Sequence, residues 1–185
     1  MYKYKTREDW LEAAIEIFRP RFDATVYGFT LPSKVRVSVG FPPKGGLSNN
    51  RRCFGICVRD SGVADRIPQI YLNPTIEKVG GEMGFLAILI HELIHACGIK
   101  NHGKDFKRMG EALGLEGNMR SSHASSWLQE DFKGIALQLG DFPHAPVVPA
   151  LQFLKPDKCR IHKCACPECG YTVRIAKKMD RSGFA

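Results

Sequence analysis

The fold of this chain is built around residues 84–95, which read Gly-Phe-Leu-Ala-Ile-Leu-Ile-His-Glu-Leu-Ile-His. The apolar run before His91 predicts a helix that is buried in the protein core. Side chains four residues apart lie on the same helical face, with Cβ atoms about 6 Å apart, so His91 and His95 can bind one metal ion. Glu92 lies beside that face. The sequence therefore predicts a metal-binding helix at the centre of the fold.

The pattern His-Glu-x-x-His is typical of zinc peptidases. Zn²⁺ accepts neutral imidazole, and three protein ligands leave a fourth position for water. The metal lowers the pKa of this water to about 7, and a neighbouring glutamate can accept its proton. The alternative, two histidines and a glutamate buried without a metal, would be costly in such an apolar helix. We therefore predict a zinc metallopeptidase with Glu92 as catalytic base.

A third ligand is expected beyond the helix. Gly98, three residues after His95, predicts the helix end, because glycine readily adopts the left-handed conformation found there. The resulting turn would bring His102 back towards the metal. Glu111 is the alternative, since some zinc peptidases take a glutamate from a later helix. We favour His102, because histidine is the better-matched ligand and Gly103 allows close approach.

His-Glu-Leu-Ile-His at 91–95, followed by His102-Gly-x-x-Phe106, resembles the SprT-like (Spartan-type) family of zinc metalloproteases. The resemblance covers most of residues 1–170. Spartan-type proteins usually have a longer segment between the second and third histidines, so the chain is more similar to short bacterial and phage members.

This resemblance implies an α+β, zincin-like fold with a small mixed sheet and active-site helices. It implies Glu92 as general base, His102 as third zinc ligand and Phe106 as a packing residue beside it. Family members of known function cleave proteins attached to DNA, and the resemblance implies the same substrate class here.

Local patterns predict the other elements. Thr6 and Asp9 resemble a capping box that opens a helix, which runs through Phe18 and is ended by Pro20. Apolar and β-branched patterns predict strands at 35–39, 52–58 and 67–72. The strand at 67–72 is the best candidate to pair with an extended substrate backbone. Helices are expected from 75 or 82 to 97, at 103–113 and at 125–139.

Composition divides the chain into a catalytic domain at 1–140, a proline-rich linker at 141–150 and a basic, cysteine-rich tail at 151–185. No uncharged apolar stretch approaches the roughly 18 residues of a membrane span, and the N-terminus lacks the apolar core of a signal peptide. Seven cysteines, four of them in the tail, favour metal binding in a reducing compartment. We expect a cytoplasmic protein without a membrane partner.

The tail contains Cys166-Pro-Glu-Cys169-Gly, the pattern of a zinc knuckle. Structural zinc is almost always four-coordinate, yet no cysteine or histidine follows Cys169. The family's zinc ribbon resembles this half and continues to another cysteine pair. Upstream residues could complete the site: Cys159 with His162 gives a reasonable set with the two knuckle cysteines, and Cys164 is a further candidate. A second, structural zinc is thus predicted, with free thiols as the alternative.

The chain carries a net charge of +8, from 27 basic and 19 acidic residues. The tail holds eight basic and three acidic residues, a net charge of +5. Lys104 and Lys107 add positive charge near His102. Clustered cations predict non-sequence-specific contacts to phosphates, so DNA is an expected partner. The alternative is a solvated basic face that maintains solubility.

The sequence thus predicts a zinc-dependent endopeptidase that cleaves DNA-bound or DNA-crosslinked proteins. A nucleic-acid-binding zinc protein without significant protease activity is the alternative, which the intact Glu92 disfavours. A regulatory zinc-ribbon protein is a third alternative, which the incomplete ribbon supports poorly.

Several other residues are considered near the site. His123, His144 and Tyr71 are candidates to stabilise an oxyanion, although each is more typical of an ordinary surface or core position. Cys53 and Cys57 are expected to be buried thiols rather than metal ligands.

Overall fold

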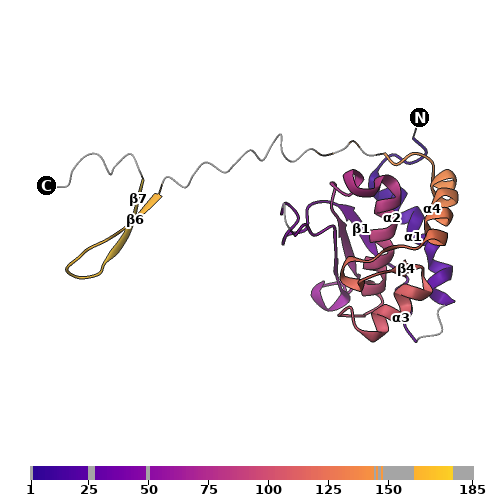
Figure 1. The fold of residues 1–185 in the computed structure, drawn as a ribbon, viewed down its shortest axis with the longest axis horizontal. Coiled ribbons are helices and arrows are strands. Elements are labelled where there is room, and N and C mark those ends of the chain that lie inside the picture. The colour runs from indigo at the N-terminus through magenta and orange to yellow at the C-terminus, as the bar shows by residue number, and fades with distance from the viewer. Residues whose placement is uncertain are drawn as a thin grey trace. The chain divides into compact units, whose positions relative to one another are not determined.

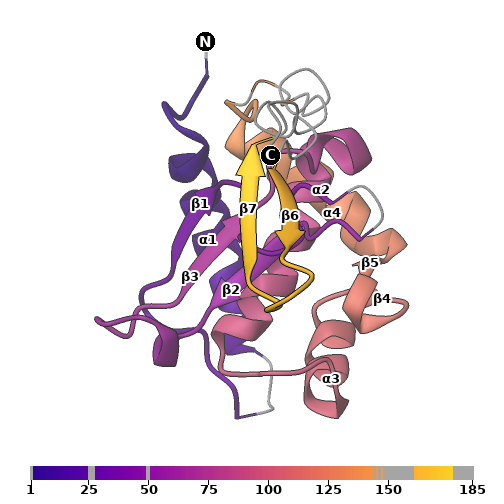
Figure 2. The ribbon, with the colours of Figure 1, turned by 90° about the vertical axis from the view of Figure 1, so that its left-hand side faces the viewer.

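The structure is a computed structural model that describes residues 2–24, 28–48, 51–143, 145, 147 and 161–176. The chain divides into two compact units, Met1–Val147 and Val148–Ala185, whose helices and strands are labelled in Figures 1 and 2. The described residues form four α-helices and three small sheets, so the predicted α+β class is confirmed. Within these ranges, none of the helices combines the length and the apolar content that a bilayer crossing requires.

Helix α1, Arg7–Asp23, opens the first unit. The predicted capping box is confirmed. The Thr6 hydroxyl accepts a hydrogen bond from the Asp9 N–H at 3.0 Å, and the Asp9 carboxylate accepts one from the Thr6 N–H at 3.2 Å. One face of the helix is buried and supplies part of the core: Trp10, Leu11, Ala14, Ile15, Phe18 and Phe22.

The predicted end of this helix after Phe18 is wrong, because α1 continues through Pro20 to Asp23. A proline lacks one N–H donor, but its carbonyl can still accept. The Pro20 carbonyl accepts a hydrogen bond from the Ala24 N–H at 3.0 Å. Burial of Phe22 in the core offsets the lost donor and keeps the last turn helical.

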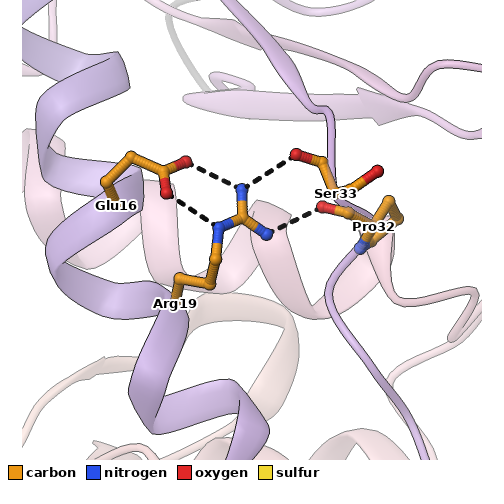
Figure 3. A network of polar contacts seen from close by, with 4 residues as sticks. All are labelled: Glu16, Arg19, Pro32 and Ser33. Atoms are coloured by element: carbon orange, nitrogen blue, oxygen red, sulfur yellow. Dashed lines mark hydrogen bonds and ion pairs between the residues drawn. The ribbon is translucent and has the colours of Figure 1, made fainter.

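Arg19 joins α1 to the segment that leads into the first strand (Figure 3). Its guanidinium donates through Nε and Nη2 to the Glu16 carboxylate, at 2.9 and 2.8 Å. Nη1 donates to the Pro32 carbonyl at 2.9 Å, and Nη2 also donates to the Ser33 carbonyl at 3.3 Å. The side chain therefore fixes this segment against the helix.

Three short strands form the main sheet: β1 Arg36–Val39, β2 Gly55–Val58 and β3 Gln69–Leu72. The order is β1-β3-β2, with β3 parallel to β1 and antiparallel to β2. In this register Ile70 lies opposite Val37 on one side and opposite Cys57 on the other. Because β3 is paired on both sides, the prediction that residues 67–72 pair with a substrate is wrong. Among the described strands, β2 pairs only with β3 and forms an edge of the sheet.

A buried asparagine fixes the segment that leads into β2. The Asn73 amide nitrogen donates to the carbonyls of Gly46 at 2.7 Å and Cys53 at 2.8 Å. Its amide oxygen accepts from the backbone N–H and the hydroxyl of Thr75, at 3.0 and 2.8 Å. The Asn73 backbone N–H donates to the Phe54 carbonyl at 2.7 Å. Both donors and both lone pairs of the side chain are therefore used.

Helix α2, Glu77–Ala96, packs against β2 and β3 and carries the central apolar run. Gly81 has a left-handed φ of 56° and kinks the helix near its start. The predicted burial of this helix is confirmed by its apolar side chains: Phe85, Leu86, Leu89, Ile90, Leu93 and Ile94. Figures 1 and 2 show the sheet on one side of α1 and α2 and the last helix, α4, on the other.

Two more helices were also predicted: α3, Lys104–Ala112, and α4, Ser126–Leu139. The Ser125 hydroxyl caps α4 by accepting a hydrogen bond from the Leu128 N–H at 3.3 Å. Four small elements lie in the connections: the 3-10 helices η1 Asp60–Gly62 and η2 Met119–Ser121, and the paired strands β4 Leu115–Glu116 and β5 His123–Ala124.

The beginning and the end of the first unit lie against each other. Trp10 Nε1 donates to the Gly140 carbonyl at 2.8 Å, and Lys3 Nζ donates to the Gln138 carbonyl at 2.7 Å. The Phe142 ring contacts Trp10 in a T-shaped arrangement and Phe85 in a tilted one, with ring centroids 5.0 and 4.6 Å apart, respectively. Phe142 is buried although it lies at the start of the segment predicted as a linker.

In the second unit, the described residues form one antiparallel hairpin of β6, Ile161–Ala165, and β7, Thr172–Ala176. The turn between them holds Cys166 and Cys169. The Cys166 N–H donates to the Tyr171 carbonyl at 2.8 Å, and the Gly170 N–H donates to the Cys166 carbonyl at 3.0 Å. Gly170 has a φ of 72°, a conformation that favours glycine.

Candidate metal centre

Three histidines converge at the C-terminal end of α2. The chain turns after the helix at Gly98, whose φ of 95° confirms the predicted left-handed conformation. This turn brings His102 back over the helix. Its Nε2 atom lies 3.0 Å from Nε2 of His91 and 3.2 Å from Nε2 of His95. The three residues form a cluster that could hold a metal ion.

The spacing of these nitrogens fits a shared metal. Two nitrogens bound to one tetrahedral zinc at 2.0–2.1 Å lie about 3.3 Å apart. The observed separations of 3.0 and 3.2 Å are close to this value. A cation between the nitrogens would also relieve the repulsion between their lone pairs.

Hydrogen bonds on the far side of two rings orient them. His95 Nδ1 lies 2.7 Å from the Ile99 carbonyl oxygen. A carbonyl can only accept, so Nδ1 of His95 carries the proton and Nε2 presents its lone pair to the cluster. His91 Nδ1 lies 2.9 Å from Ser122 Oγ, which permits the same tautomer. Such outer partners orient the histidine ligands of metal sites.

Phe106 forms the floor of the cluster. It is fully buried, and its ring centroid lies 4.7, 4.9 and 4.7 Å from those of His91, His95 and His102. One aromatic ring therefore supports all three imidazoles. The packing role that the resemblance implied for Phe106 agrees with these contacts.

Burial keeps the histidines neutral. Burial, together with the charges of His95 and His102, lowers the pKa of His91 to about 3. Burial also lowers the pKa of His95, although the hydrogen bond to the Ile99 carbonyl opposes this shift. The pKa of His102 is lowered by burial and then by His95 and Arg120. Neutral imidazole is the form that binds a metal.

Glu92 lies on α2 beside this cluster and is 5% exposed. Burial raises the pKa of its carboxyl to about 8, against a hydrogen bond from the Cys57 backbone N–H, which lowers it. Gly55 of β2 packs directly on the carboxylate: a Cβ at this position would stand 2.6 Å from Glu92 Oε1. A glycine inside a strand often marks such a close approach. This signal in the sequence was missed.

A cavity of about 620 Å³ opens over the histidines and Glu92. We call it the metal cleft; β2 with the residues just before it, α2 and residues 120–122 form its walls. Glu92 is the only carboxylate among the described lining residues, whereas four cations line the cleft: Arg52, Arg59, Lys100 and Arg120. The charges of Arg59 and Arg120 reach the cluster, since they lower the pKa of His95 and His102, respectively. Sequence analysis did not single out Arg59, Arg120 or Ser122, which come from segments without a motif.

The alternative third ligand lies elsewhere. Glu111 is exposed on α3, and its carboxylate lies 3.7 Å from Lys107 Nζ. Among the described residues, the cluster contains His102 and not Glu111. Lys104 and Lys107, predicted to contact nucleic acid, are both exposed on the same helix.

Among the other candidates, the two cysteines differ from expectation. Tyr71 on β3 and the exposed His123 on β5 are not among the described residues that line the metal cleft, and His144 lies outside the described residues. Cys53 and Cys57 were predicted to be buried. Both are partly exposed on the cleft wall, because they lie at the sheet edge. Partial burial still raises the pKa of the Cys57 thiol to about 12.

The predicted tail site falls only partly within the described residues. Cys159 lies outside them, and for His162 only its place in β6 is described. Backbone N–H groups of Cys169 and Glu168 lower the pKa of the Cys166 thiol. In the part of the tail that the structure covers, Cys164, Cys166 and Cys169 do not form a three-ligand group. The four-residue zinc site stays a prediction.

No family model, curated protein or solved structure matches this chain. A fold by itself does not determine a function. The function is therefore inferred from the chemistry of the site: three neutral imidazoles, a buried carboxylate and an open cleft.

Proposed function

We propose that this protein is a zinc-dependent endopeptidase with a zincin-like catalytic unit and Glu92 as its general base. The main support is the convergence of three histidines beside a buried carboxylate. His102 Nε2 lies 3.0 Å from His91 Nε2 and 3.2 Å from His95 Nε2, and the carboxylate is that of Glu92. Burying these ionisable groups in an apolar helix costs free energy, and such costly groups are typical of functional sites. The resemblance of the two histidine motifs to the SprT-like family supports the same activity.

Zinc is the metal that suits this site. Neutral imidazole is a preferred ligand of Zn²⁺, and three protein ligands leave a coordination position for catalysis. Bound zinc supplies Lewis acidity, which acidifies water and polarises a carbonyl. Ser122 and Ile99 hold His91 and His95 with their Nε2 atoms towards the cleft, so these ligands are oriented in advance.

Glu92 would move the protons of the hydrolysis. Its carboxylate would accept a proton from the attacking water and deliver it to the leaving amine. Burial, which raises the pKa of this carboxyl to about 8, makes it a stronger base than a surface carboxylate. A neighbouring dication favours its charged form. The Cys57 N–H, which donates to the carboxylate, would fix its orientation.

The edge strand β2 offers a place for the substrate backbone. The Phe54 carbonyl faces β3, where it accepts from the Asn73 N–H. Alternate residues of an antiparallel strand turn their backbone groups the other way, so those of Gly55 and Cys57 face the metal cleft. The Cys57 N–H there donates to Glu92 and the Gly55 carbonyl accepts from Cys53 Sγ at 3.0 Å, so the Gly55 N–H and the Cys57 carbonyl are the groups proposed to bind the substrate backbone. An extended peptide added to this edge would pass Glu92 and the histidines.

We further propose that the substrates are proteins bound or crosslinked to DNA, met in the cytoplasm. The net charge of +8 and the four cations of the metal cleft support this proposal. Lys104 and Lys107 are exposed on α3, which follows His102. The basic tail, with a zinc knuckle at Cys166 and Cys169, would add further phosphate contacts. Such contacts give affinity without sequence preference.

The experiment that tests this function compares two glutamates. Glu92→Gln keeps the size and polarity of the side chain but removes the base, so zinc content should stay at the wild-type level while caseinolytic activity falls by roughly 10²–10⁴-fold. Glu111→Gln, the same change at an exposed position on α3, should leave both unchanged. Cleavage is measured with and without DNA.

Two outcomes would contradict the proposal. Normal turnover by Glu92→Gln would mean that another group acts as base. A zinc-loaded wild-type protein that binds DNA but cleaves no protein would instead favour a nucleic-acid-binding zinc protein.

A further inference from the structure

We propose that an apolar cavity beside the metal cleft receives an apolar side chain of the substrate, next to the bond that is cleaved. This inference rests on the endopeptidase function proposed above and adds a preference for particular bonds. Three observations carry it: the continuity of the cavity with the metal cleft, the chemistry of its lining and its size.

The cavity, which we call the apolar subsite, has a volume of about 490 Å³ and is formed by α2, β5, α4 and Phe54. Phe54, Ile88 and Ser122 line both the apolar subsite and the metal cleft. The Ser122 hydroxyl bonds to His91 at 2.9 Å, so this border adjoins a histidine of the cluster. A side chain that enters the apolar subsite from the cleft therefore belongs to a residue close to the scissile bond.

The position of Phe54 links the apolar subsite to the substrate backbone. Phe54 directly precedes Gly55, the residue of β2 that packs on Glu92. A peptide paired with β2 would therefore reach the mouth of the apolar subsite within a residue or two of the catalytic carboxylate. Side chains of an extended peptide alternate in direction, so one of them points towards this opening.

The lining selects against charge. None of the described lining residues is Asp, Glu, Lys or Arg, whereas four cations line the metal cleft. Three polar side chains line the subsite. The Gln129 amide donates to the Ala124 carbonyl at 2.8 Å, the Ser122 hydroxyl bonds to His91, and His123 is exposed to solvent. A charged substrate side chain would lose much of its water and meet no Asp, Glu, Lys or Arg of opposite charge among the described lining residues. An apolar side chain loses no hydrogen bond there.

The size admits a large side chain. Gly80, Gly84 and Ala87 on the α2 wall contribute little or no side chain, and a Cβ added at Gly80 would meet no atom within 4 Å. The volume falls within the roughly 300–1,000 Å³ of ordinary ligand pockets. We therefore infer that the protein cleaves bonds flanked by Leu, Met or Phe in preference to bonds flanked by Ala or Asp.

The test uses fluorogenic peptides that are identical except for Phe, Ala or Asp at one residue flanking the cleaved bond, in one series for each side. On one side of the cleaved bond, kcat/KM should be at least about tenfold higher for the Phe peptide than for the Ala peptide, which is the discrimination that apolar pockets achieve. It should be lowest for the Asp peptide. Ala87→Phe fills the apolar subsite and should abolish the ratio between the Phe and Ala peptides. Met83→Ala, at a partly exposed position of the same wall, enlarges the subsite and should raise kcat/KM for an additional peptide with Trp relative to that for the Phe peptide. Leu137→Ala, on α4 at an 86% exposed position away from the subsite, is the matched control and should leave all ratios unchanged.

The outcomes separate this inference from the function on which it rests. Equal kcat/KM for the three peptides, with zinc-dependent cleavage intact, would overturn the apolar subsite alone. If no peptide is cleaved, the endopeptidase function fails, and fluorescence anisotropy then tests the subsite by binding. The Glu92→Gln protein should bind the labelled Phe peptide more tightly than the Ala peptide, and adding Ala87→Phe should remove the difference. Equal binding of both peptides to Glu92→Gln would overturn the subsite.

Discussion

Gly55→Ala tests the close approach of β2 to Glu92. The added Cβ would stand 2.6 Å from Glu92 Oε1, 2.9 Å from Glu92 Cγ and 2.7 Å from Ile88 Cγ2. Non-bonded heavy atoms of this kind rest about 3.5–4.0 Å apart, so the strand and helix must separate by roughly 1 Å or the carboxylate must turn away. Either response displaces the proposed base.

The magnitudes follow from this overlap. Overpacking destabilises the folded state by about 1–3 kcal/mol. Replacing glycine by alanine also reduces the backbone entropy of the unfolded chain, which stabilises the folded state by about 0.5–1 kcal/mol. We therefore expect a net destabilisation of roughly 1–2 kcal/mol. For a chain of this size each kcal/mol lowers Tm by about 2–4 °C. The effect on catalysis should be larger, because a displacement of about 1 Å costs on the order of 10²-fold in rate. Zinc content should not change, since the three histidines are not touched.

Gly134→Ala is the matched control, because Gly134 lies within α4 and a Cβ there meets no atom within 4 Å. It should stabilise the protein by about 0.5–1 kcal/mol and leave cleavage unchanged. Urea unfolding, zinc content and kcat/KM for one peptide are measured on both variants. A Gly55→Ala protein with wild-type stability and turnover would refute the placement of Glu92 against β2.

Three further predictions concern the metal, the pH dependence and DNA. His102→Ala should weaken zinc binding by orders of magnitude, whereas Glu111→Ala should leave it intact, as measured by competition with a chelator. Loss of zinc in Glu111→Ala alone would mean that Glu111, and not His102, is the third ligand. In the metal-free protein the pKa of Glu92 is raised from 4.5 to about 8, so the folded state retains a proton that the unfolded state releases, and the contribution of Glu92 to the free energy of unfolding should fall as pH rises through this window. The lowered pKa values of the three histidines act in the opposite direction below pH 6.5, so the Glu92 contribution is isolated by comparison with a variant. The difference in free energy of unfolding between Glu92→Gln and wild type, measured in urea, should therefore shift by a few kcal/mol in favour of the variant between pH 4.5 and pH 9. If this difference did not change with pH, the burial of the carboxyl would be contradicted. The logarithm of DNA affinity should fall linearly with the logarithm of salt concentration, by about 0.9 per neutralised phosphate, and removal of residues 151–185 should flatten this slope; salt-independent binding would exclude phosphate contacts.

The helices and the cluster of three histidines could be predicted because their sequence signals are local. The apolar run before His91 identifies a buried helix, and a spacing of four residues places two histidines on one face. Gly98 marks the turn that returns His102, only a few residues later. The capping box at Thr6 and Asp9 is equally local. Each of these features is decided within about one or two helical turns of sequence.

The parts that sequence reasoning missed depend on contacts between distant segments. The order β1-β3-β2 places β3 in the middle of the sheet, and no local pattern distinguishes a central strand from an edge strand of this length. Ser122 meets His91 across 31 residues, so its role becomes visible only in the fold. Pro20 ends a helix in isolation, but tertiary burial of Phe22 outweighs that preference. Gly55 did carry a signal, which required knowledge of the neighbouring helix to interpret.

The contacts of Lys3 and Trp10 with the carbonyls of Gln138 and Gly140 close the first unit at its two ends. Ends that lie this close can be joined by a short linker at a small entropic cost, which makes the unit suitable for circular permutation. New termini can be opened in the exposed turn at Asp60–Gly62, which lies outside the metal cleft. In such a permuted chain β3 and the three histidines would be synthesised first and β2 last, and we expect it to assemble the same histidine cluster beside Glu92.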